Sequence, residues 1–340
     1  MAEKLAAEFE RLVSRLRGDW LKKNRALAPE RPLYHYTDSD GLINILKSQT
    51  LRATDARYLN DALEVEYGRR LVEDILLERY SLPRRERREI TPPVSLFIKM
   101  ALSDRLFDPY EPGRFAFVTC LCEEGNLLSQ WRAYADRGAG YSIGFSWGGL
   151  FNNHRSAIDQ PLSKVLYHQE QQVTLIRELV EEICGILAAA DPSSVLENHA
   201  LATNAVRALR IVLMDYLPCF KHPSFEAKRE WRIVQNCDVY EEYEFLPNYD
   251  GYKGKNLGRL KFRPAAGTIA PYVDLEIQFG PPPFWGKLPI VSVMHGPTQH
   301  PALAKESLRM LLERYGHQVM VLGHEAGAVR ILGSDVPLRV

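Results

Sequence analysis

Apolar side chains recur every three or four positions between Leu5 and Leu16, and charged side chains occupy the opposite face. This pattern predicts an amphipathic N-terminal helix within residues 1–30. Residues 169–217 carry the same periodicity over two long segments separated by "DPSS", where a proline breaks the pattern. We therefore expect a helical hairpin at about 169–217, inserted between the strands on either side of it.

Shorter segments alternate between apolar and polar positions, which is typical of half-buried strands. Expected strands lie at 31–37, 50–55, 114–124, 139–147, 257–264, 288–297, 317–323 and 328–340. Helical patterns at 39–49, 60–80, 95–107, 125–136 and 301–316 lie between them. Consecutive strands in some places and grouped helices in others predict an α+β fold with a mixed, mainly antiparallel sheet. Residues 31–340 are expected to form a single domain around it.

Charge and composition change this picture little. Lys+Arg and Asp+Glu both number 43, so nothing drives the whole chain toward nucleic acid or an anionic membrane, although a local basic groove is not excluded. Apolar residues make up 46% of the chain, as in an average soluble protein. The five cysteines are scattered, with no metal-ligand spacing, which favours a reducing cytoplasm. No apolar run is long enough to span a membrane, and the N-terminus has no signal-peptide core.

Candidate chemistry begins in the first predicted strand. His35 and Thr37 face one side of that strand, and Tyr36 faces the other. A single histidine on a strand is more often structural than catalytic. Asn60 and Asp61, in "RYLND", either cap the helix that follows or form another wall of a site.

A second group of polar side chains lies in "LLSQWRAYAD". Trp131 is expected in the core, whereas Gln130 and Arg132 are costly to bury without partners. Arg132 is therefore either a buried structural clamp or an anion ligand. Tyr134 adds an aromatic ring to the same short helix.

The third group lies in "FKHPSFEAKREWRIV". Glu226 and Glu230 are four positions apart and are expected on the same side. If "REWRIV" is a strand, Glu230 and Arg232 share one face, and a carboxylate there suits general-base catalysis or stabilisation of an oxocarbenium ion. The alternative is a Glu230–Arg232 ion pair on the surface, which is common and energetically minor.

The motifs "LYHYT", "RYLND", "QWRAY", "EWR" and "SDVPLR" together resemble those of an uncharacterised bacterial domain-of-unknown-function family, over residues 31–339. A histidine in an opening strand followed by "GLINILKSQTLRAT" is also similar to the start of the ADP-ribosyltransferase fold. This second resemblance implies NAD as co-substrate, with His35 on a ribose and Glu230, or Glu226, as the catalytic carboxylate. Tyr134 or Tyr141 would supply an aromatic wall.

Under the same resemblance, Arg132 and Arg232 would hold the pyrophosphate. The complete candidate NAD-binding set is His35, Tyr36, Thr37, Asn60, Asp61, Gln130, Arg132, Tyr134 and Arg232. No metal site is expected.

We therefore expect a cytoplasmic ADP-ribosyltransferase or NAD-consuming effector. The resemblance places it in stress response, toxin action or phage defence, with an unidentified protein or nucleic acid as acceptor. One alternative is a metal-independent nuclease or phosphotransferase that uses His35 and Arg132 on an RNA phosphate. Another is a non-catalytic nucleotide-sensing module that offers residues 169–217 to a partner. A homodimer through the helical elements is compatible with each of these.

Overall fold

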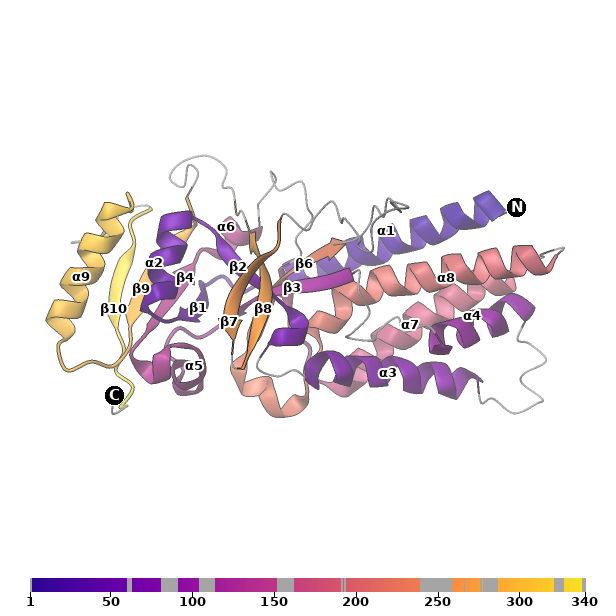
Figure 1. Ribbon diagram of the computed structural model, residues 1–340, viewed down its shortest axis with the longest axis horizontal. Coiled ribbons are helices and arrows are strands. Elements are labelled where there is room, and N and C mark those ends of the chain that lie inside the picture. The colour runs from indigo at the N-terminus through magenta and orange to yellow at the C-terminus, as the bar shows by residue number, and fades with distance from the viewer. Residues whose placement is uncertain are drawn as a thin grey trace, which may run out of the picture.

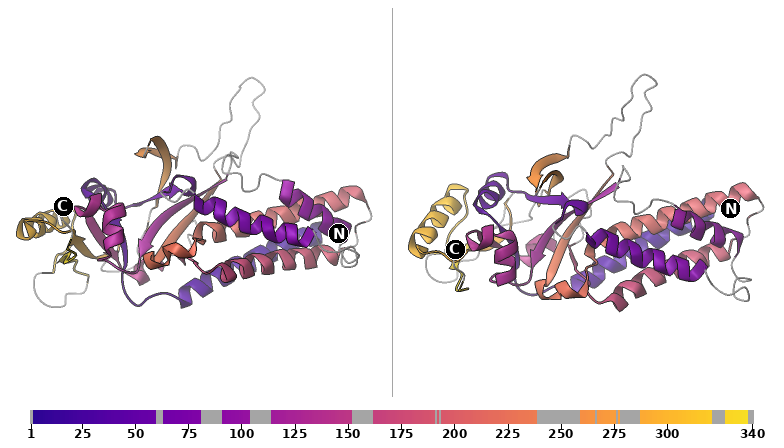
Figure 2. Two further views of the ribbon diagram at one scale, coloured as in Figure 1. Left: turned by 90° about the horizontal axis from the view of Figure 1, so that it is seen from below. Right: turned by 60° about the horizontal axis from the view of Figure 1, so that its bottom comes forward.

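The computed structural model describes residues 2–59, 63–80, 91–103, 114–151, 162–190, 192, 194–238, 259–265, 267–275, 277, 287–320 and 327–337. They form an elongated molecule with long helices at one end and a β-sheet at the other (Figure 1). The N-terminus lies at the helical end and the C-terminus at the sheet end. Figure 2 shows the same two parts from two further directions.

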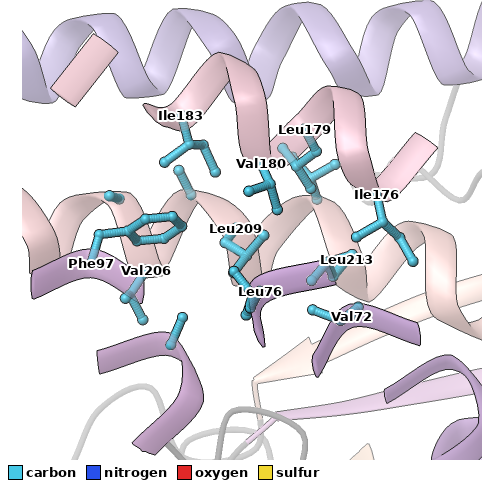
Figure 3. Close-up of a cluster of buried hydrophobic side chains, with 14 of the residues drawn as sticks. Val72, Leu76, Phe97, Ile176, Leu179, Val180, Ile183, Val206, Leu209 and Leu213 are labelled. Atoms are coloured by element: carbon cyan, nitrogen blue, oxygen red, sulfur yellow. The ribbon is translucent and has the colours of Figure 1, made fainter. Parts of the chain in front are cut away.

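Five helices form the helical lobe: α1 (Ala2–Ala26), α3 (Leu63–Tyr80), α4 (Pro92–Ser103), α7 (Gln169–Ala188) and α8 (Val195–Tyr216). Their apolar faces meet in one buried cluster. Figure 3 shows part of it, where Ile176 and Val180 of α7 point toward Leu209 and Leu213 of α8. Each such fully buried aliphatic side chain stabilises the fold by roughly 1.5–3 kcal/mol. Helix α1 lies within the range predicted for the amphipathic helix, α7 and α8 lie within the range predicted for the hairpin, and all three share this core with α3 and α4.

In the described part of the chain the sheet has ten strands: β1 (Leu33–Thr37), β2 (Leu51–Asp55), β3 (Arg114–Cys122), β4 (Tyr141–Phe145), β5 (Leu162–Lys164), β6 (Glu230–Asp238), β7 (Lys261–Ala265), β8 (Thr268–Leu275), β9 (Ile290–His295) and β10 (Arg330–Gly333). The order is β10-β9-β4-β1-β3-β2-β8-β7, and β6 joins β3 and β5. Apart from β10 with β9, these pairs are antiparallel. The predicted α+β fold with a mainly antiparallel sheet is confirmed.

Short helices pack around the sheet. They are α2 (Ser39–Ser48), α5 (Leu128–Tyr134), α6 (Trp147–Phe151) and α9 (Pro301–Arg314). Helix α2 begins where sequence reasoning expects, because Asp38 Oδ1 accepts a hydrogen bond from the Gly41 amide at 2.7 Å. It ends at Gln49, whose left-handed φ of 54° turns the chain into β2. The side chain of Gln49 holds this turn, since its Oε1 accepts a hydrogen bond from the Leu288 amide at 2.9 Å.

The sheet is split at β3. Strand β6 pairs with β3 along all nine residues, so it occupies one edge of that strand. The other edge is shared: β2 pairs with Phe117 and Val118, and β1 pairs with Cys122. Between these contacts, no strand among the described residues pairs with this edge of β3. The two half-sheets, β1-β4-β9-β10 and β2-β8-β7, diverge from this point.

Two strands were not predicted, and one prediction was only partly met. Strand β5 has three residues, too few for an alternating pattern, and β8 contains Pro271, which argues against a strand in sequence. For 317–323, the structure gives only a bridge between Val319 and Val329, and residues 321–326 lie outside the described part.

No helix in the described part of the chain is both long and apolar enough to cross a membrane.

Candidate functional site

A cavity of about 300 Å³ lies at the split in the sheet. Both half-sheets and β6 contribute side chains to it. Strand β1 contributes His35, β2 contributes Arg52 and Thr54, and β6 contributes Glu230 and Arg232. Segments far apart in sequence therefore meet because β3 holds β1, β2 and β6 around itself.

His35 lies in the gap between β1 and β3. Its Nδ1 is 3.0 Å from the carbonyl oxygen of Cys120, on the β3 edge between the contacts with β1 and β2. A carbonyl oxygen only accepts hydrogen bonds, so Nδ1 carries the hydrogen and donates it. Burial lowers the pKa of His35, and the hydrogen bond to Cys120 opposes this only in part. The ring is therefore neutral at pH 7, and Nε2 is left as an acceptor beside the cavity.

Four buried charged side chains form the floor of the cavity, which we call the floor quartet: Glu64, Lys221, Glu230 and Arg232. Lys221 Nζ lies 2.6 Å from Glu64 Oε1 and 3.0 Å from Glu230 Oε1. Arg232 Nη2 lies 2.7 Å from Glu64 Oε2 and 3.0 Å from Glu230 Oε2. Each cation thus contacts both carboxylates, and the quartet carries no net charge.

The quartet fixes the ionisation of Glu230. Burial alone would raise the pKa of this carboxyl, but Arg232, Lys221 and Lys228 together hold the pKa below its ordinary value. Glu230 is therefore a carboxylate throughout the physiological range. The alternative of a Glu230–Arg232 ion pair on the surface is wrong, because both side chains are buried within a larger network.

Tyr134 of α5 forms a wall of the cavity beside Lys228. Lys228 Nζ donates to the Tyr134 hydroxyl at 3.3 Å and lies 5.6 Å from the centre of its ring. Burial raises the pKa of Tyr134 above its ordinary value, despite the adjacent lysine. The phenol is therefore neutral at physiological pH and presents its ring to the cavity.

Arg52 and Arg263 lie at the rim, on the two strands that flank β8. Arg263 Nη2 donates to Thr54 Oγ1 at 3.3 Å, and the Arg52 guanidinium lies 5.1 Å from the ring centre of Tyr272. Both partners orient an arginine without neutralising it. In the part of the chain that the structure describes, neither arginine has a carboxylate within ion-pair distance.

Several predicted site residues lie elsewhere. Tyr36 is on the opposite face of β1, where its hydroxyl donates to the Glu124 carbonyl at 2.7 Å and its ring meets Trp131 edge-on. Thr37 lies against Gly41 at the start of α2. Tyr141 is half-buried on β4 and does not line the cavity. Asn60 and Asp61 fall outside the described residues, so their predicted roles stay predictions.

Helix α5 also separates its predicted residues. Trp131 is fully buried, as expected, and Tyr134 is one turn further along toward the cavity. Gln130 is buried as well, without lining the cavity. Arg132 points outward and is exposed, so it is not a buried clamp, and it does not meet His35 in the cavity. The expectation that Arg132 holds an anion in the same pocket is wrong for this reason.

Glu226 is also separated from the cavity. It lies in the 3₁₀ turn Pro223–Lys228, is exposed, and pairs with His168 at 3.3 Å. Arg229 then adopts a left-handed φ of 45°, which reorients the chain before β6 begins. The expectation that Glu226 and Glu230 share one side is therefore wrong, and Glu230 is the carboxylate in the cavity.

Sequence reasoning missed part of the site. Arg52 and Arg263 stand singly on strands, where their sequence context does not distinguish them from solvated residues. Lys221 lies within the segment that supplies Glu230, and its position nine residues earlier gave no indication of contact. Among the described residues, no group of three or more histidine, cysteine or acidic side chains is arranged to hold a metal ion.

Residues 130–233 match the model of a family described as a protein of unknown function, DUF2971. This match fits the predicted resemblance to an uncharacterised domain family. It begins on α5 and ends within β6, so it includes Tyr134, Lys221, Glu230 and Arg232. His35 lies outside the matched segment. Neither a curated protein nor a solved structure matches the chain.

Proposed function

We propose that the cavity binds NAD and that the protein cleaves the bond between nicotinamide and ribose, either as an ADP-ribosyltransferase or as an NAD-consuming effector. The observation that carries this proposal is the shared cavity of His35 and Glu230. One presents a neutral hydrogen-bond acceptor and the other a permanent negative charge. The carboxylate can stabilise a ribose ring that becomes cationic during bond cleavage, and the neutral acceptor can hold one of its hydroxyl groups in place.

His35 is suited to bind a ribose hydroxyl. Its Nδ1–H is engaged by Cys120, so the ring orientation and the tautomer are fixed before a ligand arrives. Nε2 then accepts a hydrogen bond from the hydroxyl. An imidazolium could not do this, and the lowered pKa keeps the ring neutral.

Glu230 is suited to stabilise the developing charge. When the glycosidic bond breaks, its electron pair leaves with the nicotinamide nitrogen and C1′ of the ribose becomes positive. A carboxylate has about four acceptor positions. Lys221 donates to both oxygens of Glu230 and Arg232 donates to Oε2, while Lys228 lies 3.9 Å from Oε1, beyond hydrogen-bond distance. We propose that the remaining acceptor position takes a ribose hydroxyl.

The split antiparallel sheet supports an ADP-ribosyltransferase-like architecture as part of this proposal. Tyr134 would stack on the nicotinamide ring, as the resemblance in sequence implies. The ADP-ribose would pass to water or to a protein or nucleic acid acceptor. We place this activity in the cytoplasm, in stress response, toxin action or phage defence.

The test is release of nicotinamide from NAD, measured by chromatography with the purified protein. We expect Glu230→Gln and His35→Ala to abolish release, whereas Glu226→Gln, a matched change outside the cavity, retains it. Thermal melting separates loss of chemistry from loss of fold. Equal release by the Glu230→Gln variant and the parent would refute the assignment of Glu230.

A second candidate is a module that binds the nucleotide without reacting, and one observation favours it. Lys221 and Arg232 already neutralise Glu230, which reduces the field available to a ribosyl cation. In this case NAD raises the melting temperature and no nicotinamide appears. The helical lobe, including residues 169–217, would then contact the partner.

A further inference from the structure

The geometry points to Arg52 and Arg263 as a binding site for a diphosphate at the rim of the cavity. This inference rests on the proposed function, because it names the part of the dinucleotide that these arginines contact. It also replaces the sequence expectation that Arg132 and Arg232 hold the phosphates. Arg132 is exposed and outside the cavity, and Arg232 is occupied by Glu64, Glu230 and the Pro218 carbonyl.

The first argument is charge. Among the described residues, four cations and two carboxylates line the cavity, and the floor quartet accounts for two of the cations and both carboxylates. The remaining two positive charges belong to Arg52 and Arg263. A ligand that binds here therefore meets a neutral floor and a rim of charge +2, which matches the two negative charges of a diphosphate linkage.

The second argument is how the arginines are held. Paired surface arginines normally contact carboxylates, as Arg309 contacts Glu306 and Glu313 on α9. Arg52 instead lies over Tyr272, and Arg263 donates to a threonine hydroxyl. These neutral partners restrict the side chains but leave most of the guanidinium N–H groups free. Pre-oriented, unneutralised guanidinium groups are suited to bidentate contacts with phosphate oxygens.

The third argument is position. Arg52 and Thr54 are two positions apart on β2, so they share one face of the strand, and Thr54 also accepts a hydrogen bond from Arg263. Both arginines therefore approach the cavity from the β2-β8-β7 half-sheet. His35 approaches from the other half-sheet. A ligand with its ribose at His35 therefore reaches across the split to place its phosphates on the arginines.

The phosphate groups that contact these arginines have two possible sources: the diphosphate of the dinucleotide, or two neighbouring phosphodiesters of a nucleic acid acceptor. Calorimetric titration of ADP-ribose, ADP and adenosine into the parent, Arg52→Gln, Arg263→Gln and the double variant tests the shared chemistry. We expect each substitution to weaken ADP-ribose about tenfold and to leave adenosine unchanged. Arg132→Gln, an exposed arginine outside the cavity, is the matched control and should change nothing. Unaltered ADP-ribose affinity in the double variant, together with unaltered transfer of label to a single-stranded oligonucleotide, would overturn the inference.

Two further measurements distinguish the dinucleotide from the acceptor as the source of the phosphates, and the rim site from the proposed catalysis. If the dinucleotide is the source, the double variant raises the KM for NAD and leaves kcat close to that of the parent. If the acceptor is the source, the KM for NAD is unchanged and transfer of label to a single-stranded oligonucleotide falls. Tight, arginine-dependent ADP-ribose binding without nicotinamide release supports the rim site and refutes the proposed catalysis.

Discussion

Lys221→Met is the substitution by which the floor quartet can be tested most directly. The side chain of Lys221 is 2% exposed, and it contacts both Glu64 and Glu230. Among the described residues, its removal leaves Arg232 as the one cation that contacts both buried carboxylates. Breaking a buried ion pair by deleting one partner costs about 3–5 kcal/mol. We expect a loss of this size in the free energy of unfolding at pH 8.

The loss should depend on pH, because two adjacent carboxylates then share only Arg232, with Lys228 3.9 Å from Glu230, and their mutual repulsion raises the pKa of one of them. A raised folded-state pKa means that the folded variant takes up a proton before the unfolded chain does. Its deficit is therefore largest at high pH and shrinks as the pH falls toward 5. Adding Glu64→Gln to Lys221→Met restores neutrality and should recover part of the lost stability.

The assay is urea unfolding followed by fluorescence, with midpoints compared at constant slope at pH 8 and pH 5. Lys164→Met is the matched control: Lys164 pairs with Glu123 at 2.9 Å, but its side chain is 35% exposed. A partly exposed pair is worth at most about 1 kcal/mol. If Lys221→Met and Lys164→Met lower stability equally, or if pH has no effect on the difference, the reasoning about the quartet is wrong.

Three further predictions concern other parts of the molecule. Burial, reinforced by Lys287, lowers the pKa of His317 to about 4, so the unfolded state binds a proton first and stability falls as the pH drops from about 6.5 to 4. His317→Gln should make the urea midpoint of unfolding depend less on pH over that range, and a pH dependence equal to that of the parent would contradict this. Asn126→Ala removes the acceptor of Trp131 Nε1 and Ser334 Oγ, at 2.8 and 2.6 Å, and should cost about 1–3 kcal/mol with faster amide exchange in residues 334–337. Unchanged exchange there would show that Asn126 does not hold this segment. Burial raises the pKa of Cys219 to about 12, so native protein at pH 7 should resist iodoacetamide until it unfolds, whereas rapid native alkylation would disprove the burial.

The helical lobe was predictable because its signal is local. Long periodic apolar stripes and a proline break identify α7 and α8 without knowledge of any partner. The opening β1-α2-β2 unit was equally clear, since Asp38 caps α2 through a contact within three residues. Strand β8 was missed because Pro271 argues against a strand, and its pairing with β2 depends on residues more than 200 positions earlier.

The site was predictable only in part, for a related reason. His35 and Glu230 were identified as chemically unusual residues, and the structure places both in one cavity. Arg132 is chemically just as unusual, but the direction of its side chain depends on which face of α5 is buried. Trp131 is buried and Tyr134 lines the cavity, so Arg132 points to solvent. The role of a residue such as Arg52 depends on which side chains surround it in the folded protein. No spacing in the sequence reports that a tyrosine and a threonine hold two arginines without neutralising them.

The oxygen that orients His35 belongs to the main chain of residue 120. A side-chain acceptor could be lost through one codon change, whereas this oxygen is present whichever amino acid occupies the position. The cysteine itself is therefore replaceable as far as the imidazole is concerned, provided that β3 keeps its course. Natural variants must instead preserve the part of the β3 edge opposite His35 that is not paired with β1 or β2. A residue inserted into β1 or β2 that extended either ladder across this edge would compete for the oxygen and release the ring, although every cavity side chain remained unchanged.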